Sequence, residues 1–209
     1  MPVWQSETTG HPTPIPYRPN PNSPHPGQGY FNIRQDPSLL ERLWEAKKMP
    51  GFLDYIRVLN TFPSMFHSLG SDWAISPDEA VPGCSLKLTS YVQLAFEVFE
   101  WNLCRTRFEA VYEALSEHPG AKALANRQGI NLEFKPVIFR QFGGVQGWSA
   151  TFWVHAYGKT TVGLRPLWRS TMDLLVAVLI DKSRDLMAEI PAAGITISGV
   201  TLDSMRIPS

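Results

Sequence analysis

Two stretches decide the fold: Ile130-Asn-Leu-Glu-Phe-Lys135 and Trp148-Ser-Ala-Thr-Phe-Trp-Val-His-Ala-Tyr157. In both, every second side chain is apolar, which is the period-two pattern of a strand with one buried face. Gly158-Lys159 follows the second stretch and is typical of a two-residue hairpin turn. We therefore expect an antiparallel meander whose three strands cover residues 130–139, 148–157 and 160–164.

Helical signals precede the meander. Asp36-Pro37 combines an N-cap carboxylate with proline at the first helical position, and Met49-Pro50-Gly51 ends the helix that this signal predicts. A second helix follows, with Phe52, Tyr55, Ile56 and Leu59 at helical spacing. Apolar residues recur every three or four positions over residues 90–116, which predicts a long helix that is apolar on two sides.

The chain after the meander predicts one more helix and one more strand. Ser170 begins a helix that Pro191 ends, and residues 194–202 alternate as a strand does. Helices that are segregated from an antiparallel sheet indicate the α+β class. The expected order is N-terminal helices, then β-β-β-α-β, with the sheet packed on the helices.

Residues 1–29 form an arm in this interpretation, and residues 30–209 form a single domain. Eight of the 18 prolines precede Gly27, and proline excludes both a helix and a central strand there. Two alternatives stay open: an unstructured tail, or an extended strap across this domain or a partner. Aromatic residues favour the strap because they could anchor it: Trp4, Tyr17, Tyr30 and Phe31.

Composition limits the functional classes. Hydrophobic residues make up 44% of the chain, enough for a core, and 19 basic residues balance 19 acidic ones. A net charge of zero gives no overall attraction to nucleic acid or membrane. Cys84 and Cys104 are expected as buried free thiols of a cytoplasmic protein, and no apolar run approaches the length of a membrane span.

Catalytic signatures are not found. The glycines at 143, 144 and 147 precede a strand rather than a helix, which favours a hairpin loop over a phosphate cradle. None of the five histidines has a metal ligand or a catalytic partner at a suitable spacing. We therefore predict no catalytic residue, metal ligand or cofactor, although an enzyme site assembled from distant residues stays open.

The span from Lys135 to Arg169 contains five basic residues and no acidic residue, together with many aromatic ones. Alternation places Trp148 and Phe152 on one face of the second strand and Trp153, His155 and Tyr157 on the other. Either the helix over residues 90–116 covers this second face, or the face is open and binds a partner. The predicted partner-binding residues are Trp148, Trp153, His155, Tyr157, Arg165, Trp168 and Arg169.

We expect a non-enzymatic binding protein that docks a protein partner on this aromatic and basic face, as an inhibitor, an immunity-type protein or an adaptor subunit would. An acidic partner would suit the arginines. The alternative is a single-stranded DNA or RNA binder that stacks bases on the same residues. The acidic residues between Glu97 and Glu117 would weaken the positive field and favour the protein partner.

Overall fold

The computed structural model describes residues 2–16, 30–190, 196–197 and 200–201. One six-stranded sheet organises the chain, with the strand order β1-β5-β6-β4-β3 and with β2 also paired to β5. Two antiparallel hairpins supply its centre: β3 (Phe66–Pro77) with β4 (Leu86–Phe96), and β5 (Gln128–Phe139) with β6 (Val145–Gly158). The antiparallel pairing of β4 with β6 joins the hairpins.

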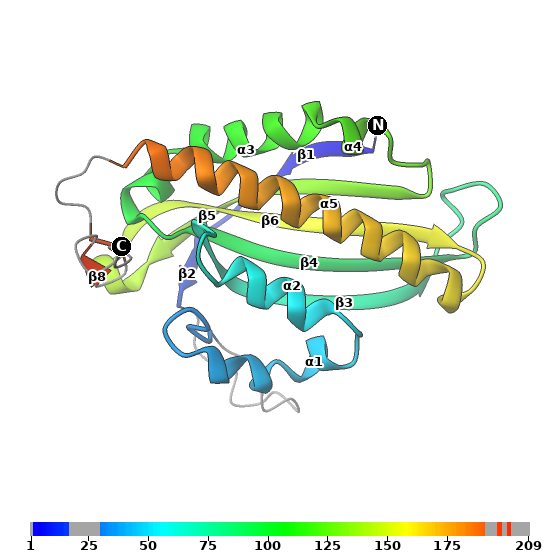
Figure 1. Cartoon of the computed structure of the whole chain (residues 1–209), viewed down its shortest axis with the longest axis horizontal. Coiled ribbons are helices and arrows are strands. Elements are labelled where there is room, and N and C mark those ends of the chain that lie inside the picture. The colour runs from blue at the N-terminus through cyan, green and yellow to red at the C-terminus, as the bar shows by residue number, and fades with distance from the viewer. Residues whose placement is uncertain (1, 17–29, 191–195, 198–199, 202–209) are drawn as a thin grey trace, which may run out of the picture.

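The predicted period-two pattern of β5 and β6 is present and defines the core. Leu132 lies opposite Phe152, and Ile130 lies opposite Val154, so one face of the hairpin is fully buried. We call this side the helix face. The helices α2 (Phe52–Leu59), α3 (Arg105–Glu117) and α5 (Thr161–Ala188) all lie against it, as Figure 1 shows.

Helix α5 is the main cover of the sheet. Its buried stripe recurs at helical spacing through Leu164, Trp168, Met172, Leu175 and Leu179. The indole of Trp168 packs edge-on against Phe52 of α2 and donates from Nε1 to the Ser90 hydroxyl over 2.7 Å. This one side chain therefore ties α5 to α2 and to β4.

The strand predicted over residues 160–164 is wrong, because this segment is the beginning of α5. Thr160 is the N-cap, and its hydroxyl accepts from the Gly163 N–H over 3.2 Å. Five residues rich in threonine and valine favour a strand locally, but Leu164 gains full burial as the first residue of the helical stripe. Tertiary packing overrides the local preference.

The long helix predicted over residues 90–116 is also wrong in its first half. Residues 86–96 form β4, residues 99–103 form the 3-10 helix η2 (Phe99–Leu103), and α3 begins only at Arg105. All residues from Val92 to Phe96 are buried, because both faces of β4 are covered at this end. A strand buried on both faces loses its alternation and resembles a helix in sequence.

Other predicted elements are present with altered bounds. The helix over 36–49 is the 3-10 helix η1 (Pro37–Arg42) followed by the short α1 (Trp44–Lys47), and Asp36 caps it as expected by accepting from the Ser38 N–H. The strand predicted over 194–202 is instead the small hairpin of β7 (Thr196–Ile197) and β8 (Val200–Thr201). The chain is thus mixed α and β, without the order β-β-β-α-β.

Part of the predicted arm belongs to the sheet. Strands β1 (Val3–Glu7) and β2 (Thr13–Ile15) pair in parallel with β5, at the edge that β6 leaves open. This position agrees with the exclusion of proline-rich segments from central strands. Residues 17–29 of the arm lie outside the described residues, and the division at residue 29 stays a prediction. Among the free thiols, Cys84 is buried as expected and Cys104 is exposed.

A buried asparagine fixes the turn that leaves β4. The Asn102 side chain accepts from the Phe96 N–H over 2.7 Å and donates to the carbonyls of Phe96, Val98 and Phe99 over 2.9–3.2 Å. These bonds satisfy backbone groups that have no water to bind. They also set the position of Glu97, which lies between Phe96 and Val98.

We expect Asn102→Ala to lower the free energy of unfolding by roughly 2–3 kcal/mol, because it leaves buried backbone groups unsatisfied. Urea unfolding followed by circular dichroism measures this loss. The neighbouring Leu103 is exposed, so Leu103→Ala is the control and should change stability by less than about 0.5 kcal/mol. Equal losses in the two variants would contradict the role given to Asn102.

Candidate functional site

The sheet face opposite the helix face carries a row of aromatic side chains, and we call it the aromatic face. The register places Trp153 of β6 between Tyr91 of β4 and Asn131 of β5. The Tyr91 and Trp153 rings lie 4.9 Å apart between centres, and Trp153 Nε1 donates to Glu133 Oε2 over 2.7 Å. The tryptophan is therefore held in one orientation while part of its ring stays exposed.

A second row of the aromatic face, beyond the row of His155, combines a tyrosine with a lysine. Tyr157 of β6 lies opposite Lys87 of β4, and the Lys87 ammonium stands 5.4 Å from the centre of the Tyr157 ring. This distance is within the range of a cation–π contact. Both side chains are partly exposed, so a partner could contact the tyrosine ring and the ammonium group together.

His155, between these two rows, is buried rather than presented to a partner. The Trp4 ring of β1 stacks on it, with ring centres 5.5 Å apart and planes 11° from parallel, and Thr89 Oγ1 lies 3.2 Å from Nδ1. Burial lowers the pKa of His155 to about 4, and the positive charge of Lys87 adds to this effect. Trp4 can approach so closely because residue 129 beneath it is glycine.

The structure brings together only part of the predicted binding set. Trp153, His155 and Tyr157 share the aromatic face as expected. Trp148 points to the helix face, where the Arg105 guanidinium lies 5.5 Å from its ring. Arg165, Trp168 and Arg169 all belong to α5 on that same side, and Trp168 is buried in the core. The expected proximity of Arg165 to the aromatic face was based on a strand that does not form.

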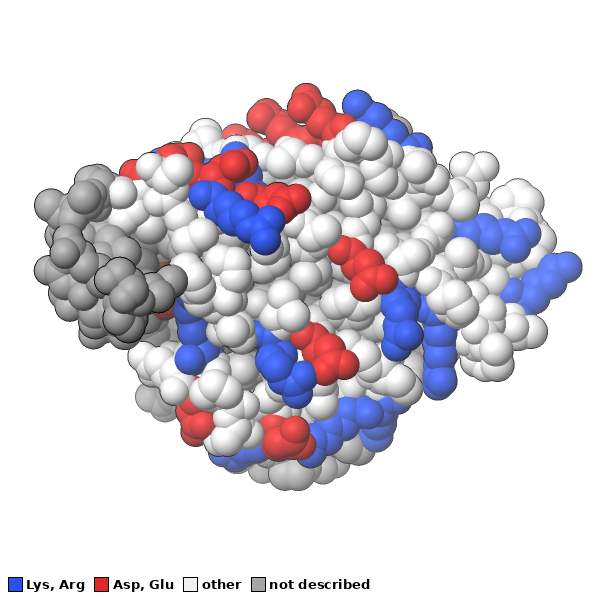
Figure 2. All heavy atoms as spheres, viewed as in Figure 1, with Lys and Arg blue, Asp and Glu red and all other residues white. Residues whose placement is uncertain are grey.

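The basic character expected for the aromatic face is correspondingly reduced. Lys87 and Lys135 are on this face, but Glu133 and Asp72 share it through the sheet register. On the helix side, Figure 2 shows basic and acidic side chains next to one another. The helix predicted over residues 90–116 does not cover the aromatic face. Residues 90–96 belong to β4, and α3 packs on the helix face (Figure 1).

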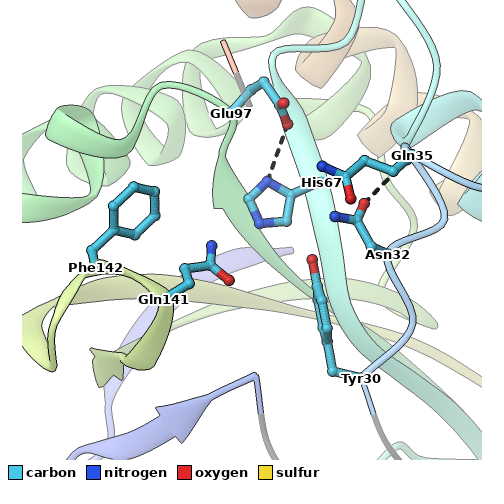
Figure 3. A pocket seen from close by; sticks show the side chains of 7 residues that line it. All are labelled: Tyr30, Asn32, Gln35, His67, Glu97, Gln141 and Phe142. Atoms are coloured by element: carbon cyan, nitrogen blue, oxygen red, sulfur yellow. Dashed lines mark hydrogen bonds and ion pairs between the residues drawn. The ribbon is translucent and has the colours of Figure 1, made fainter. Parts of the chain in front are cut away.

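A polar pocket of about 390 Å³ lies at the end of the sheet where β3 begins and β4 ends. His67 comes from β3, Glu97 follows β4, and residues 141 and 142 belong to η3 (Arg140–Phe142), which follows β5. The segment before η1 supplies the remaining wall. The lining side chains, shown in Figure 3, are Tyr30, Asn32, Gln35, His67, Glu97, Gln141 and Phe142.

A buried charge holds this pocket together. The Glu97 side chain is 2% exposed, and its Oε2 lies 3.4 Å from Arg34 Nε and 3.3 Å from His67 Nδ1. Arg34 is held in turn by the Phe66 carbonyl, to which its Nη1 donates over 3.0 Å. Burial and the negative charge of Glu97 raise the pKa of Tyr30 to about 12, so the phenol keeps its proton at neutral pH.

Sequence reasoning missed this pocket because two of its elements were misassigned. His67 is on a strand that was not predicted, and Glu97 fell within the predicted helix. One signal was present: Glu97 is the single charged residue in the run Val92-Gln-Leu-Ala-Phe-Glu-Val-Phe99. If that run is a buried strand, its acid requires a paired partner, and Arg34 and His67 supply the pairing.

Comparison with protein-family models, with curated proteins and with solved structures gives no match. Within the described part of the chain, no group of three or more metal-binding side chains comes together. No helix in that part has the length and apolar character that a bilayer crossing requires. The aromatic face and the pocket are therefore the two candidate sites in this part of the chain.

The burial of His155 predicts a pH dependence of stability. Its pKa of about 4 in the folded chain is below its ordinary value of 6.5. Between these values the unfolded chain binds a proton that the folded chain does not, so stability falls as pH is lowered from about 6.5 to about 4. His155→Gln should remove the contribution of about one proton. The slope of the unfolding free energy against pH should therefore fall by ~1.4 kcal/mol per pH unit.

Urea unfolding at a series of pH values between 4 and 7.5 measures this slope. His11 is exposed, and His11→Gln is the control that should leave the slope unchanged. Identical slopes for His155→Gln and the unmodified chain would show that His155 titrates normally and that Trp4 does not shield it.

Proposed function

We propose that the chain is a non-enzymatic binding protein that docks a protein partner on the aromatic face. The observation that carries the proposal is the Tyr91–Trp153 pair beside Tyr157 and Lys87, on the side of the sheet opposite the helices. Tyrosine and tryptophan held in fixed orientations are typical anchors of protein interfaces, since little conformational entropy is lost on binding. An inhibitor, an immunity-type protein or an adaptor subunit would use such a surface.

Charge favours a protein over nucleic acid as the occupant. A single-stranded nucleic acid requires several cations along the path of its backbone. The aromatic face has Lys87 and Lys135, whereas Arg165 and Arg169 are on α5, against the opposite face of the sheet. A protein with exposed apolar groups and one or two carboxylates near Lys87 is better matched to this composition.

The decisive variant is Tyr157→Ala combined with Lys87→Glu, because both side chains are partly exposed and neither belongs to the core. The partner is captured from the native cell extract by the full chain after nuclease treatment and is then purified. We expect the variant to weaken its binding at least tenfold in calorimetry, which is the size of an interface hot spot. The melting temperature should stay near that of the unmodified chain.

Val162, exposed on α5, provides the control: Val162→Ala should bind the partner normally. If the unmodified chain, the double variant and Val162→Ala bind the partner equally well, the aromatic face is not part of the interface. If nuclease instead abolishes every interaction, and binding of an oligonucleotide falls steeply with salt, the same face serves the single-stranded DNA or RNA alternative.

A further inference from the structure

We call the polar pocket around His67 and Glu97 the His67–Glu97 pocket. Most of its hydrogen-bonding side chains are uncharged. Three of its seven lining side chains are carboxamides, from Asn32, Gln35 and Gln141. Each carboxamide offers a donor and an acceptor in one plane. A backbone hydrogen bond holds the Asn32 side chain in place, because its Oδ1 accepts from the Gln35 N–H over 3.1 Å.

The charges within the pocket cancel. Glu97 is negative and contacts the guanidinium of Arg34, which is itself mostly buried. The lining residues that the structure describes include no lysine and no arginine. An anionic ligand such as a phosphate ester would meet the Glu97 carboxylate without a cation of its own, so the chemistry of the lining selects an uncharged ligand.

His67 presents a hydrogen-bonding atom to the pocket. Its Nδ1 faces Glu97 Oε2 at 3.3 Å, and the other ring nitrogen points into the cavity (Figure 3). Nε2 is therefore available to a hydrogen-bonding group of a ligand, as an acceptor or a donor according to the tautomer. Tyr30 adds a donor, since its phenol keeps its proton. Together with the three carboxamides, these groups match a ligand that offers both an N–H or O–H group and an acceptor.

An aromatic wall completes the pocket. Phe142 lines the pocket and is 43% exposed as a residue, and its ring stacks on Phe99 with ring centres 3.8 Å apart. Phe99 in turn packs edge-on against Phe139 of β5. The wall is thus supported from behind, and its free side suits the flat face of a ligand.

From these features we infer that the pocket binds an uncharged planar nitrogen heterocycle, a nucleobase or its nucleoside. Carboxamides pair with the donor and acceptor edge of a base, and aromatic rings stack on its face. The volume of about 390 Å³ accommodates a nucleoside. The inference is independent of the proposed protein partner, because the residues that carry it do not belong to the aromatic face.

Isothermal titration of the full chain with adenosine, guanosine, cytidine and uridine tests the inference, each beside its 5′-monophosphate. We expect at least one nucleoside to bind with a dissociation constant of about 1 mM or tighter. The matching monophosphate should bind at least tenfold more weakly, because the pocket offers its charge no cation. No measurable binding by any nucleoside, or tighter binding of the monophosphate, would overturn the assignment.

Exposed residues of η3 supply variants, and the melting temperature of each variant checks that it is folded. Phe142→Ala should weaken nucleoside binding at least about fivefold, because it removes the stacking wall. Gln141→Ala should weaken it about three- to tenfold, because it removes a hydrogen-bonding donor and acceptor. Val145→Ala and Gln146→Ala are matched controls, because both residues are exposed close by in sequence and do not line the pocket. Tyr30→Phe, which keeps the ring, should weaken binding about three- to tenfold. If Phe142→Ala, Gln141→Ala and Tyr30→Phe all leave binding unchanged, the nucleoside binds elsewhere.

Discussion

The antiparallel register of β4 against β6 is the constraint on which the rest of the structure depends. It joins into one sheet two hairpins that are separated in the chain by residues 97–127, pairing Val92 with Phe152 and Leu88 with Ala156. A shift by one residue would exchange the two faces of the strand and bring Thr151 and Trp153 into the core. The same register also delivers Trp153 beside Tyr91. The pairing of β3 with β4 then places the end of β4 beside the beginning of β3, where the pocket forms.

Sequence patterns predicted the elements in which local preference and tertiary environment agree. The alternation of β5 and β6 and the spacing of α2 were correct because each element has one buried face. The Asp36 cap was correct because its hydrogen bond is local. Patterns failed where burial comes from both sides, as in β4, and where a polar strand such as β3 gains its stability from its neighbours. The β-branched residues from Thr160 to Val162 suit either a strand or the beginning of a helix. The burial of Leu164 favours the helix.

The same distinction between local pattern and tertiary environment applies to the candidate sites. Trp153, His155 and Tyr157 were correctly placed together because strand alternation determines which side chains share a face. Arg165 was expected near this face because it follows the strand predicted over residues 160–164, and that segment is instead the beginning of α5. The pocket requires four chain segments to meet, and only the sheet topology shows that His67 and Glu97 are neighbours. Glu97, which follows β4, is a buried carboxylate that is costly unless it is paired, so Arg34 and His67 are needed for the fold itself.

The pairing of β1 with β5 has a consequence for how the protein emerges from the ribosome. Ser6 and Asn131, which bond across these two strands, are 125 residues apart in the chain. At ordinary translation rates the first strand waits on the order of ten seconds before its partner is synthesised. During that interval Val3 and Trp4 are apolar side chains of a nascent chain without their native contacts. The prolines that follow them keep this waiting segment from forming a competing helix or an internal strand, and so preserve it for the edge of β5.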